Sequence, residues 1–110
     1  MPVQPAPMQD VFAALAEPRR RTIVEILARD GERTVTQLVD VLDLPQPAVS
    51  KHLSVLRDAG LVDVEPRGRM RVYRLRPESI RAVHAWASTF EKFWSHHLDR
   101  IARRAERPRG

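Results

Sequence analysis

Residues 46–57 carry polar side chains at a spacing that suits contact with a polyanion. The side chains that would share one face of a helix are Gln46, Ser50, Lys51, Ser54 and Arg57. A glutamine amide can pair with adenine and a lysine ammonium can donate to guanine, while hydroxyl and guanidinium groups suit phosphates. The chemistry of this face is therefore that of contact with nucleic acid. On an isolated helix the same residues more often form only a solvated surface, so the neighbouring elements must decide.

A second set of cations follows shortly afterwards. Five arginines fall within ten residues, with no acid between them: Arg67, Arg69, Arg71, Arg74 and Arg76. Arg67 and Arg69 flank the glycine of an expected turn, so we expect them to project furthest and to contact the minor groove or its phosphates. Arg74 and Arg76 lie at the base of the expected hairpin. We interpret them as solvated charges that discourage pairing between strand edges.

Hydrophobic spacing places the first polar set on a helix of its own. Val49, Leu53 and Leu56 recur at i, i+4 and i+7 and would face inward. Pro45 and Pro47 prevent an earlier helix from running on, and the N-terminal end of the second helix in a helix-turn-helix enters the major groove. The full set of expected DNA contacts is Gln46, Pro47, Ser50, Lys51, His52 (between the two faces), Ser54, Arg57, Arg67, Arg69 and Arg71.

Three helices are expected before this one. The first covers residues 10–17 and is capped by Asp10, and the second covers residues 18–30 and is ended by a glycine. The third begins at Thr34 or Thr36. Its buried stripe would consist of Leu38, Val39 and Leu42.

After Gly60 the apolar period changes from helical to alternating. Two β-prone runs, residues 61–65 and 70–75, are separated by a turn at Arg67-Gly68, and the pattern is helical again over residues 77–105. A hairpin directly after a helix-turn-helix is the wing of a winged helix. The predicted fold is therefore mainly α with a small β-hairpin, a winged helix-turn-helix of about five helices plus a two-stranded wing.

Length and composition narrow the class of protein. A chain of 110 residues with 43% hydrophobic and 30% charged residues predicts one soluble globular domain, which we expect over residues 10–105. Residues 1–9 would form a flexible arm and residues 106–110 a flexible tail. No apolar run approaches the ~18 residues of a membrane span, and the N-terminus is unlike a signal peptide. We expect a cytoplasmic protein with no membrane partner.

Charge and missing residue types exclude further classes. A formal net charge of +5 favours a polyanionic partner. The absence of cysteine excludes disulfides, thiolate metal sites and cysteine nucleophiles. The chain also has no glycine-rich phosphate loop and no serine with a plausibly placed base, so we predict no enzyme, no catalytic residues and no cofactor.

The last expected helix carries more apolar surface than a small body can cover, which predicts a homodimer. Its two tryptophans and two of the three phenylalanines are more often core or a dimer seam than a ligand box. The expected interface residues are Val11, Phe12, Leu15, Trp86, Phe90, Phe93, Trp94, His97 and Ile101. A two-fold protein predicts a palindromic operator.

Two clusters leave alternatives open. Arg19, Arg20 and Arg21 begin the second helix, where the dipole disfavours cations, so they need a partner. That partner is an internal acid (Glu17 or Glu25) or the DNA backbone.

The histidines are the second cluster. His84, His96 and His97 could join a partner chain's residues in a non-standard metal site, but the nearest carboxylate after His97 lies only two residues on. We predict no metal.

Three separated blocks resemble the ArsR/SmtB family of bacterial repressors. They read FAALAEPRRRTIVEIL at residues 12–27, PAVSKHLSVLRDAGLV at 47–62 and GRMRVYRL at 68–75. The resemblance covers residues 10–98. It implies a winged-helix homodimer that binds an operator, blocks transcription and is usually released by a chemical signal.

The resemblance does not extend to the metal-binding motifs of that family. Thr34 and Gln37 stand where the cysteine-rich motif of the third helix would have ligands, and the last-helix site is replaced at positions holding Pro77, Ser79, Phe90 and Phe93. The stretch FEKFWSHHLDRI is similar to a metal-independent subgroup, often encoded beside START-like small-molecule-binding proteins.

These observations predict a dimeric, sequence-specific repressor of double-stranded DNA that is not metal-responsive, with an unidentified small-molecule effector as a further partner. Two alternatives remain. One is an architectural protein that coats DNA without sequence preference, and the other is a winged helix used for protein–protein contact.

Overall fold

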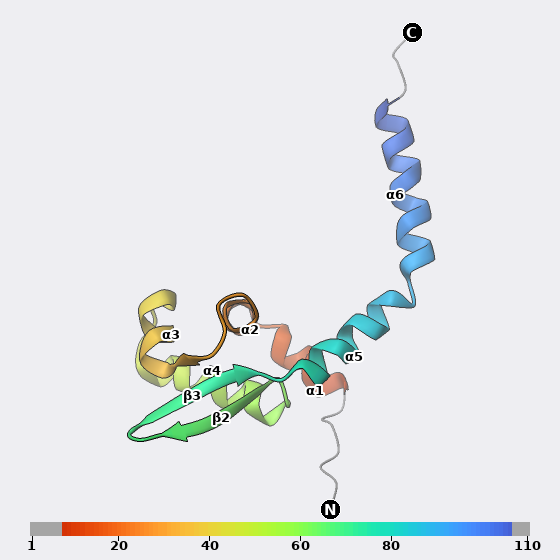
Figure 1. The fold of residues 1–110 in the computed structure, drawn as a ribbon. Helices are drawn as coiled ribbons and strands as arrows, with labels where there is room; N and C mark the ends of the chain where they lie inside the picture. The colour runs from red at the N-terminus through yellow and green to blue at the C-terminus, as the bar shows by residue number, and fades with distance from the viewer. Residues whose placement is uncertain (1–7, 107–110) are drawn as a thin grey trace, which may run out of the picture. The chain divides into compact units, whose positions relative to one another are not determined.

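A computed structural model describes residues 8–106 of the chain, with side chains described through residue 104. The arm expected over residues 1–9 and the tail over 106–110 therefore fall mostly outside the described residues. Where they overlap, Met8 and Gln9 are helical and so is Glu106, contrary to the expected boundaries. The elements in chain order are α1 (Met8–Leu15), α2 (Pro18–Asp30), β1 (Arg33–Thr34), α3 (Val35–Leu42), α4 (Gln46–Asp58), β2 (Val62–Arg67), β3 (Met70–Leu75), α5 (Pro77–Ser88) and α6 (Glu91–Glu106) (Figure 1).

The described chain divides into two compact units, one ending at Ile80 and one beginning at Arg81. The first unit is a winged helix, mainly helical with a small antiparallel sheet, as the sequence predicts. Its core is formed by side chains with no measurable exposure: Ile23, Leu38, Val49, Leu53, Leu56 and Leu61. These residues come from α2, α3, α4 and the start of the hairpin, so the core joins the helices to the wing.

The ends of α1 and α2 are set by residues near their junction. α1 begins at Met8, which places Asp10 in its first turn rather than at its cap. α2 begins with Pro18, and the Glu17 carboxylate caps it by accepting a hydrogen bond from the Arg20 backbone N–H at 3.0 Å. Gly31, with φ of 83°, ends α2 as predicted, because a left-handed backbone favours glycine.

α3 and α4 form the helix-turn-helix. Thr34 caps α3 in a reciprocal arrangement: its Oγ1 accepts from the Gln37 N–H at 3.2 Å, and Gln37 Oε1 accepts from the Thr34 N–H at 2.9 Å. Leu38 is buried, but Val39 and Leu42 of the expected stripe are only half-buried. Asp43 ends α3 in the left-handed conformation, with φ of 53°, and α4 begins three residues later.

The hairpin belongs to a three-stranded antiparallel sheet of order β1-β3-β2. β1 was not predicted, because a two-residue strand leaves no periodic signal; it pairs Arg33 with Tyr73 and Thr34 with Val72. In the outer part of the hairpin Arg67 pairs with Met70. The turn therefore consists of Gly68, with φ of 61°, and Arg69, one residue later than expected.

The second unit contains the rest of α5 and all of α6. The predicted single helix over residues 77–105 is wrong, because the chain breaks at Thr89 and Phe90. Ser88 Oγ donates to the His84 carbonyl at 2.8 Å and Thr89 Oγ1 donates to the Trp86 carbonyl at 2.7 Å. The Thr89 and Phe90 N–H groups make tight i to i−3 bonds, each 3.1 Å. Hydroxyls that bond to backbone carbonyls compete with the helix and favour such a kink.

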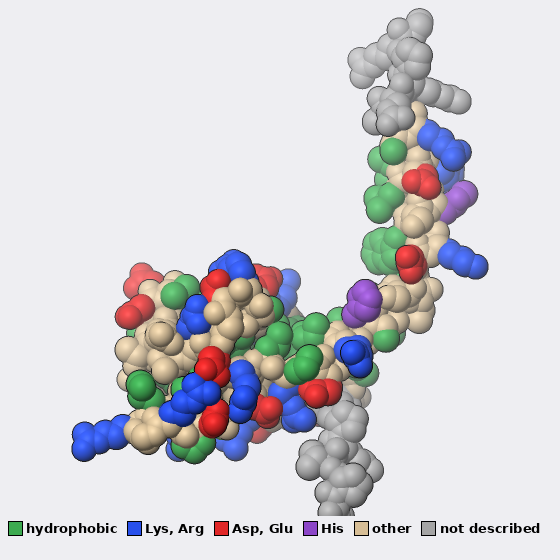
Figure 2. Space-filling model, in the orientation of Figure 1, with side chains coloured by type: hydrophobic (Ala, Val, Ile, Leu, Met, Phe, Trp, Pro, Cys, Tyr) green, Lys and Arg blue, Asp and Glu red, His purple; other side chains and the backbone are tan. Residues whose placement is uncertain are grey.

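Apolar side chains of the second unit lie on its surface. Figure 2 shows hydrophobic side chains along one side of α6, and lysine, arginine and histidine side chains along the other. Phe93 is 65% exposed, and Trp86, Phe90, Trp94, Leu98 and Ile101 are also exposed. Within the unit, Trp86 and Phe90 meet edge to face with centroids 5.2 Å apart, and Phe93 stacks on His97 at 5.7 Å. No helix among residues 8–106 is long and apolar enough to cross a membrane.

Candidate nucleic-acid interface

The polar face of α4 points away from the core. Val49, Leu53 and Leu56 are completely buried, which confirms the predicted inward stripe. Six of the seven residues of this helix that are expected to contact DNA are exposed: Gln46, Pro47, Ser50, Lys51, Ser54 and Arg57. Because the core fixes the rotation of α4, these six side chains are held on one accessible surface.

His52 is the exception on α4. It is half-buried, as its position between the two faces predicts, and its Nδ1 is buried without a hydrogen-bond partner among the described residues. Burial raises the pKa of nearby Glu17, but the Arg20 and Arg19 backbone N–H groups and the charges of His52 and Arg20 outweigh burial and leave that pKa below its usual value. His52 therefore lies near the α1–α2 junction, half-buried, unlike the six exposed side chains of α4.

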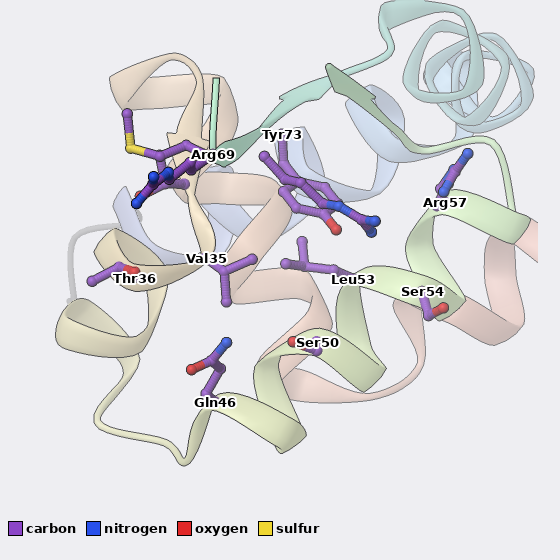
Figure 3. A pocket seen from close by; sticks show the side chains of 12 residues that line it. Val35, Thr36, Gln46, Ser50, Leu53, Ser54, Arg57, Arg69 and Tyr73 are labelled. Atoms are coloured by element: carbon purple, nitrogen blue, oxygen red, sulfur yellow. The ribbon is translucent and has the colours of Figure 1, made fainter. Parts of the chain in front are cut away.

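A groove of about 520 Å³ separates α4 from β3 and the start of α3. Figure 3 shows Gln46, Ser50, Ser54 and Arg57 arranged along α4 at this groove, with Arg69 and Tyr73 on the hairpin side. The full lining is Thr34, Val35, Thr36, Gln46, Ser50, Leu53, Ser54, Arg57, Arg69, Met70, Arg71 and Tyr73. Three of these residues are arginines and none is acidic, so the groove suits an anionic backbone.

Strand register decides which wing arginines lie on the α4 side. Successive residues of a strand point to opposite faces, and cross-strand partners share a face. Arg71 pairs with Pro66, and Tyr73 with Val64, so these four residues share one face, from which Arg71 and Tyr73 line the groove. Met70, beside the turn, also reaches the lining, although it pairs with Arg67. Arg67 is one residue out of phase with Pro66 and therefore belongs to the opposite face.

The opposite face of the wing holds an ion-paired chain of alternating charge. Arg67 Nη1 donates to Glu32 Oε1 at 2.6 Å, and Arg67 Nη2 donates to Glu32 Oε2 at 3.1 Å and to Glu65 Oε2 at 3.0 Å. Arg74 Nη2 donates to the same Glu65 oxygen at 3.2 Å. The hydrogen bond from Arg67 lowers the pKa of Glu32 and the bonds to Glu32 and Glu65 raise the pKa of Arg67.

This chain changes one expectation about the wing. Arg67 was expected to project furthest beside Arg69, but its side chain is bound to two carboxylates. The side chains of Arg74 and Arg76 are 51% and 38% exposed, as expected for solvated charges, and each also forms ion pairs: Arg74 with Glu65, and Arg76 with Asp63 at 3.6 Å and Glu78 at 3.9 Å. Sequence reasoning could not find the Glu32 pair, because Glu32 is 35 residues from Arg67. Figure 2 shows cations and acids intermixed over the hairpin, with cationic side chains at its tip.

The arginines at the start of α2 have a partner that was not expected. Arg20 Nε donates to the Ala14 carbonyl at 2.7 Å and its Nη2 to the Ala13 carbonyl at 3.4 Å. These carbonyls lie at the end of α1, where the helix dipole favours a cation. The Arg20 guanidinium therefore hydrogen-bonds to neither Glu17 nor Glu25, although the Arg20 backbone N–H donates to Glu17. Arg19 and Arg21 are exposed.

The expected dimer residues differ in their availability. Val11 is only 1% exposed and belongs to the core of the first unit, so it cannot offer a surface to a partner; its inclusion is corrected. Leu15 is half-buried and Phe12 is 37% exposed. The expected residues of the second unit are all exposed: Trp86, Phe90, Phe93, Trp94, His97 and Ile101.

The positions that would hold metal ligands have other roles. Thr34 and Gln37 are both used to cap α3, and Ser79, which is buried, donates from Oγ to the Gly60 carbonyl at 2.8 Å. Within residues 8–106 no three histidine, aspartate or glutamate side chains gather closely enough to hold a metal ion.

A helix-turn-helix, a wing beside it and an acid-free groove lined by arginines together define a winged-helix DNA-binding protein. Residues 17–64 match the family model described as bacterial regulatory protein, arsR family. The arsenic resistance transcriptional regulator ArsR1 of Pseudomonas putida is 35% identical over 102 residues, which cover 89% of this chain and 80% of that protein. The chain belongs to the ArsR family.

Two further comparisons agree. The HTH-type transcriptional regulator Rv2034 of Mycobacterium tuberculosis is 41% identical over 87 residues, covering 79% of this chain and 78% of the relative. The crystal structure of an ArsR family transcriptional regulator superposes with a TM-score of 0.71 at 33% identity, covering 80% of this chain and 96% of the other. The chain is thus a DNA-binding transcriptional regulator and not an enzyme.

Proposed function

We propose that the chain is a homodimeric repressor that recognises a palindromic operator. The observation that carries this proposal is the acid-free groove between the exposed face of α4 and Arg69 and Arg71 of the wing. A helix whose polar face is fixed by a rigid core can present the same donors to base edges in every complex.

The side chains of this surface divide into two roles. Gln46 and Lys51, near the start of α4, suit base edges, with Gln46 able to pair with adenine and Lys51 to donate to guanine. Arg57, Arg69 and Arg71 suit phosphates, because they line the groove and no aspartate or glutamate is among its lining residues. Pro47, Ser50 and Ser54 complete the surface.

Dimerisation is supported by the second unit. Its exposed aromatic side chains form an apolar surface of a kind that soluble proteins rarely leave uncovered, and a second copy is the simplest partner. The two-fold symmetry of such a dimer would require two half-sites related by a dyad.

Insensitivity to metals is supported by the chemistry of the residues present. Relatives named for arsenic resistance share the fold, but this chain has no cysteine thiolate for a soft ion. The hydroxyl and amide at positions 34 and 37 are engaged in capping. A small organic effector, rather than a metal ion, is the signal we propose for this cytoplasmic regulator.

The test is quantitative footprinting on the DNA upstream of its own gene, followed by fluorescence anisotropy on the protected duplex and on a scrambled duplex. We expect a protected palindrome and at least ~10³-fold tighter binding to it than to the scrambled sequence. Equal affinity for both duplexes would favour the architectural alternative, and zinc or arsenite should not change operator affinity. An absence of DNA binding with little response to salt would favour protein–protein contact.

A further inference from the structure

The back of the wing is held by a carboxylate that binds a guanidinium much as a phosphate would. Glu32 accepts from both terminal nitrogens of Arg67 at 2.6 and 3.1 Å, a two-pronged pairing that arginine also forms with phosphate. Glu32 lies in the loop between α2 and β1, whereas Arg67 ends β2 beside the turn. The pair therefore joins the outer wing to the helical body.

The position of Arg67 makes its pairing consequential. It is next to Gly68 and Arg69, at the part of the hairpin that extends furthest from the two residue pairs that β1 makes with β3. The Arg67 side chain is about half exposed, at 47%, and that of Glu32 is 40% exposed. An arginine at this place with no acid beside it would be within reach of any backbone that approaches the tip.

The other arginines of the outer wing are not restrained in this way. Arg69 and Arg71 line the groove, and neither forms an ion pair among the described residues. Glu32 and Glu65 therefore neutralise the cation on one face of the wing and leave those on the α4 side available. Only the α4 side of the described wing therefore presents arginines that are not ion-paired.

We propose that Glu32 is a specificity-determining residue that keeps Arg67 from binding DNA phosphates and so lowers affinity for non-operator DNA. Phosphate contacts carry no sequence information, whereas base contacts distinguish sequences. In an operator complex the base contacts of α4 fix the position of the wing, so a released Arg67 on the wing's other face would add little there. A non-operator complex has no such fixed position and can recruit Arg67, so withholding this cation weakens non-operator binding more than operator binding. The proposal rests on the operator-binding function for its biological meaning, but its chemical step concerns any duplex.

The experiment measures the full chain on a scrambled duplex by anisotropy across a salt series. Glu32→Gln is compared with Glu25→Gln, which makes the same charge change at an exposed residue of α2. Each additional phosphate contact steepens the dependence of log K on log salt by about 0.9. When the salt concentration rises from about 50 to about 200 mM, the affinity of E32Q for the scrambled duplex should fall by a factor about three times larger than that of E25Q, for each Arg67 that binds a phosphate.

A double-mutant cycle assigns the effect to the pair. In an Arg67→Gln background, E32Q should change neither the scrambled-duplex affinity nor its salt slope relative to E25Q in that background. Glu65→Gln leaves both hydrogen bonds that Arg67 donates to Glu32. It should therefore raise the scrambled-duplex salt slope less than E32Q, when both are compared in an Arg74→Gln background that removes the other arginine paired with Glu65. On the operator, E32Q should lower the ratio of operator to scrambled affinity.

Two results would overturn the proposal: E32Q and E25Q with the same salt slope, or an E32Q effect that persists without Arg67. Circular dichroism spectra and melting curves of all variants establish that each is folded. Wild-type protein that binds operator and scrambled duplex equally would refute the operator-binding function, while the slope comparison on scrambled DNA would still decide the role of Glu32.

Discussion

Residues 8–80 and residues 81–106 use apolar side chains in opposite ways. The first unit contains every buried apolar side chain among the residues whose exposure is described, from Val11 to Tyr73. The second contains none, although it carries both tryptophans and two of the three phenylalanines of the chain. A unit with its own core can hold a DNA-reading surface rigid, whereas the second unit leaves its large apolar side chains exposed, as the proposed dimer interface requires.

The largest expected effect tests the self-sufficiency of the first unit. Leu53→Ala removes a side chain with 0% exposure from beneath the polar face of α4, and it should lower the free energy of unfolding by about 3 kcal/mol. Chemical denaturation followed by circular dichroism measures this loss. Val41→Ala, at a side chain that is 61% exposed on α3, is the matched control and should change the value by less than ~0.5 kcal/mol.

The next effect concerns the second unit. Trp94→Ala removes an aromatic side chain that is 54% exposed, and it should raise the dimer dissociation constant at least ~10-fold if this surface is the dimer interface. Sedimentation velocity over a range of protein concentrations measures that constant. Glu91→Gln in the same helix should leave it nearly unchanged. A Trp94→Ala protein that dimerises as tightly as wild type would place the interface elsewhere.

A smaller effect distinguishes the two faces of the wing. Arg71→Ala should weaken binding to operator and scrambled duplexes alike and reduce the salt slope by about 0.9 per lost phosphate contact. Arg74→Ala removes the same charge from the opposite face, where Glu65 already neutralises it, and should leave the slope close to that of wild type. Equal slopes for the two variants would contradict the division of the wing into two faces.

The smallest effect is a titration. The carboxyl of Glu32 should titrate below its usual range, and Arg67→Gln should move its pKa back up, because the bond from Arg67 is the main cause of the shift. Because the folded-state pKa of Glu32 is lowered, the pair adds to the free energy of unfolding at pH values above the unfolded-state pKa. This contribution is lost as the pH falls through the folded-state pKa. NMR of the side-chain carboxyl carbon follows this directly. An unchanged Glu32 midpoint in the variant would show that Arg67 does not lower this pKa.

Local signals made much of the first unit predictable. The apolar spacing of Val49, Leu53 and Leu56 and the prolines before them set the rotation and start of α4 from sequence alone. A glycine placed the end of α2, and a threonine placed the start of α3. The hairpin followed from a change of period. These features depend on residues a few positions apart, which is why pattern reasoning could find them.

Contacts between distant residues were beyond that reasoning. Five arginines without an intervening acid predicted free charge at the tip, but Arg67 pairs with Glu32, from the loop before β1, and with Glu65, two residues earlier on its own strand. Only the contact with Glu32 joins residues that are distant in the sequence. The helix break at Thr89 depends on which backbone carbonyls accept the Ser88 and Thr89 hydroxyls. The helical spacing of apolar residues continues through this break, so the sequence pattern does not indicate it. The short strand β1 is defined only by its pairing with the edge of β3, through Arg33 with Tyr73 and Thr34 with Val72.

The reciprocal cap of α3 has a consequence for anyone who would redesign this regulator. Installing thiolate ligands by changing Thr34 and Gln37 to cysteine would delete both hydrogen bonds that begin the helix, at a cost of about 1 kcal/mol for the lost cap alone. Thr34 and Gln37 can therefore either cap α3, the first helix of the helix-turn-helix, or be replaced by metal ligands, but not both. In such a variant the bound ion would have to stabilise the start of α3 in place of the cap. The metal-free form would then have the less stable α3.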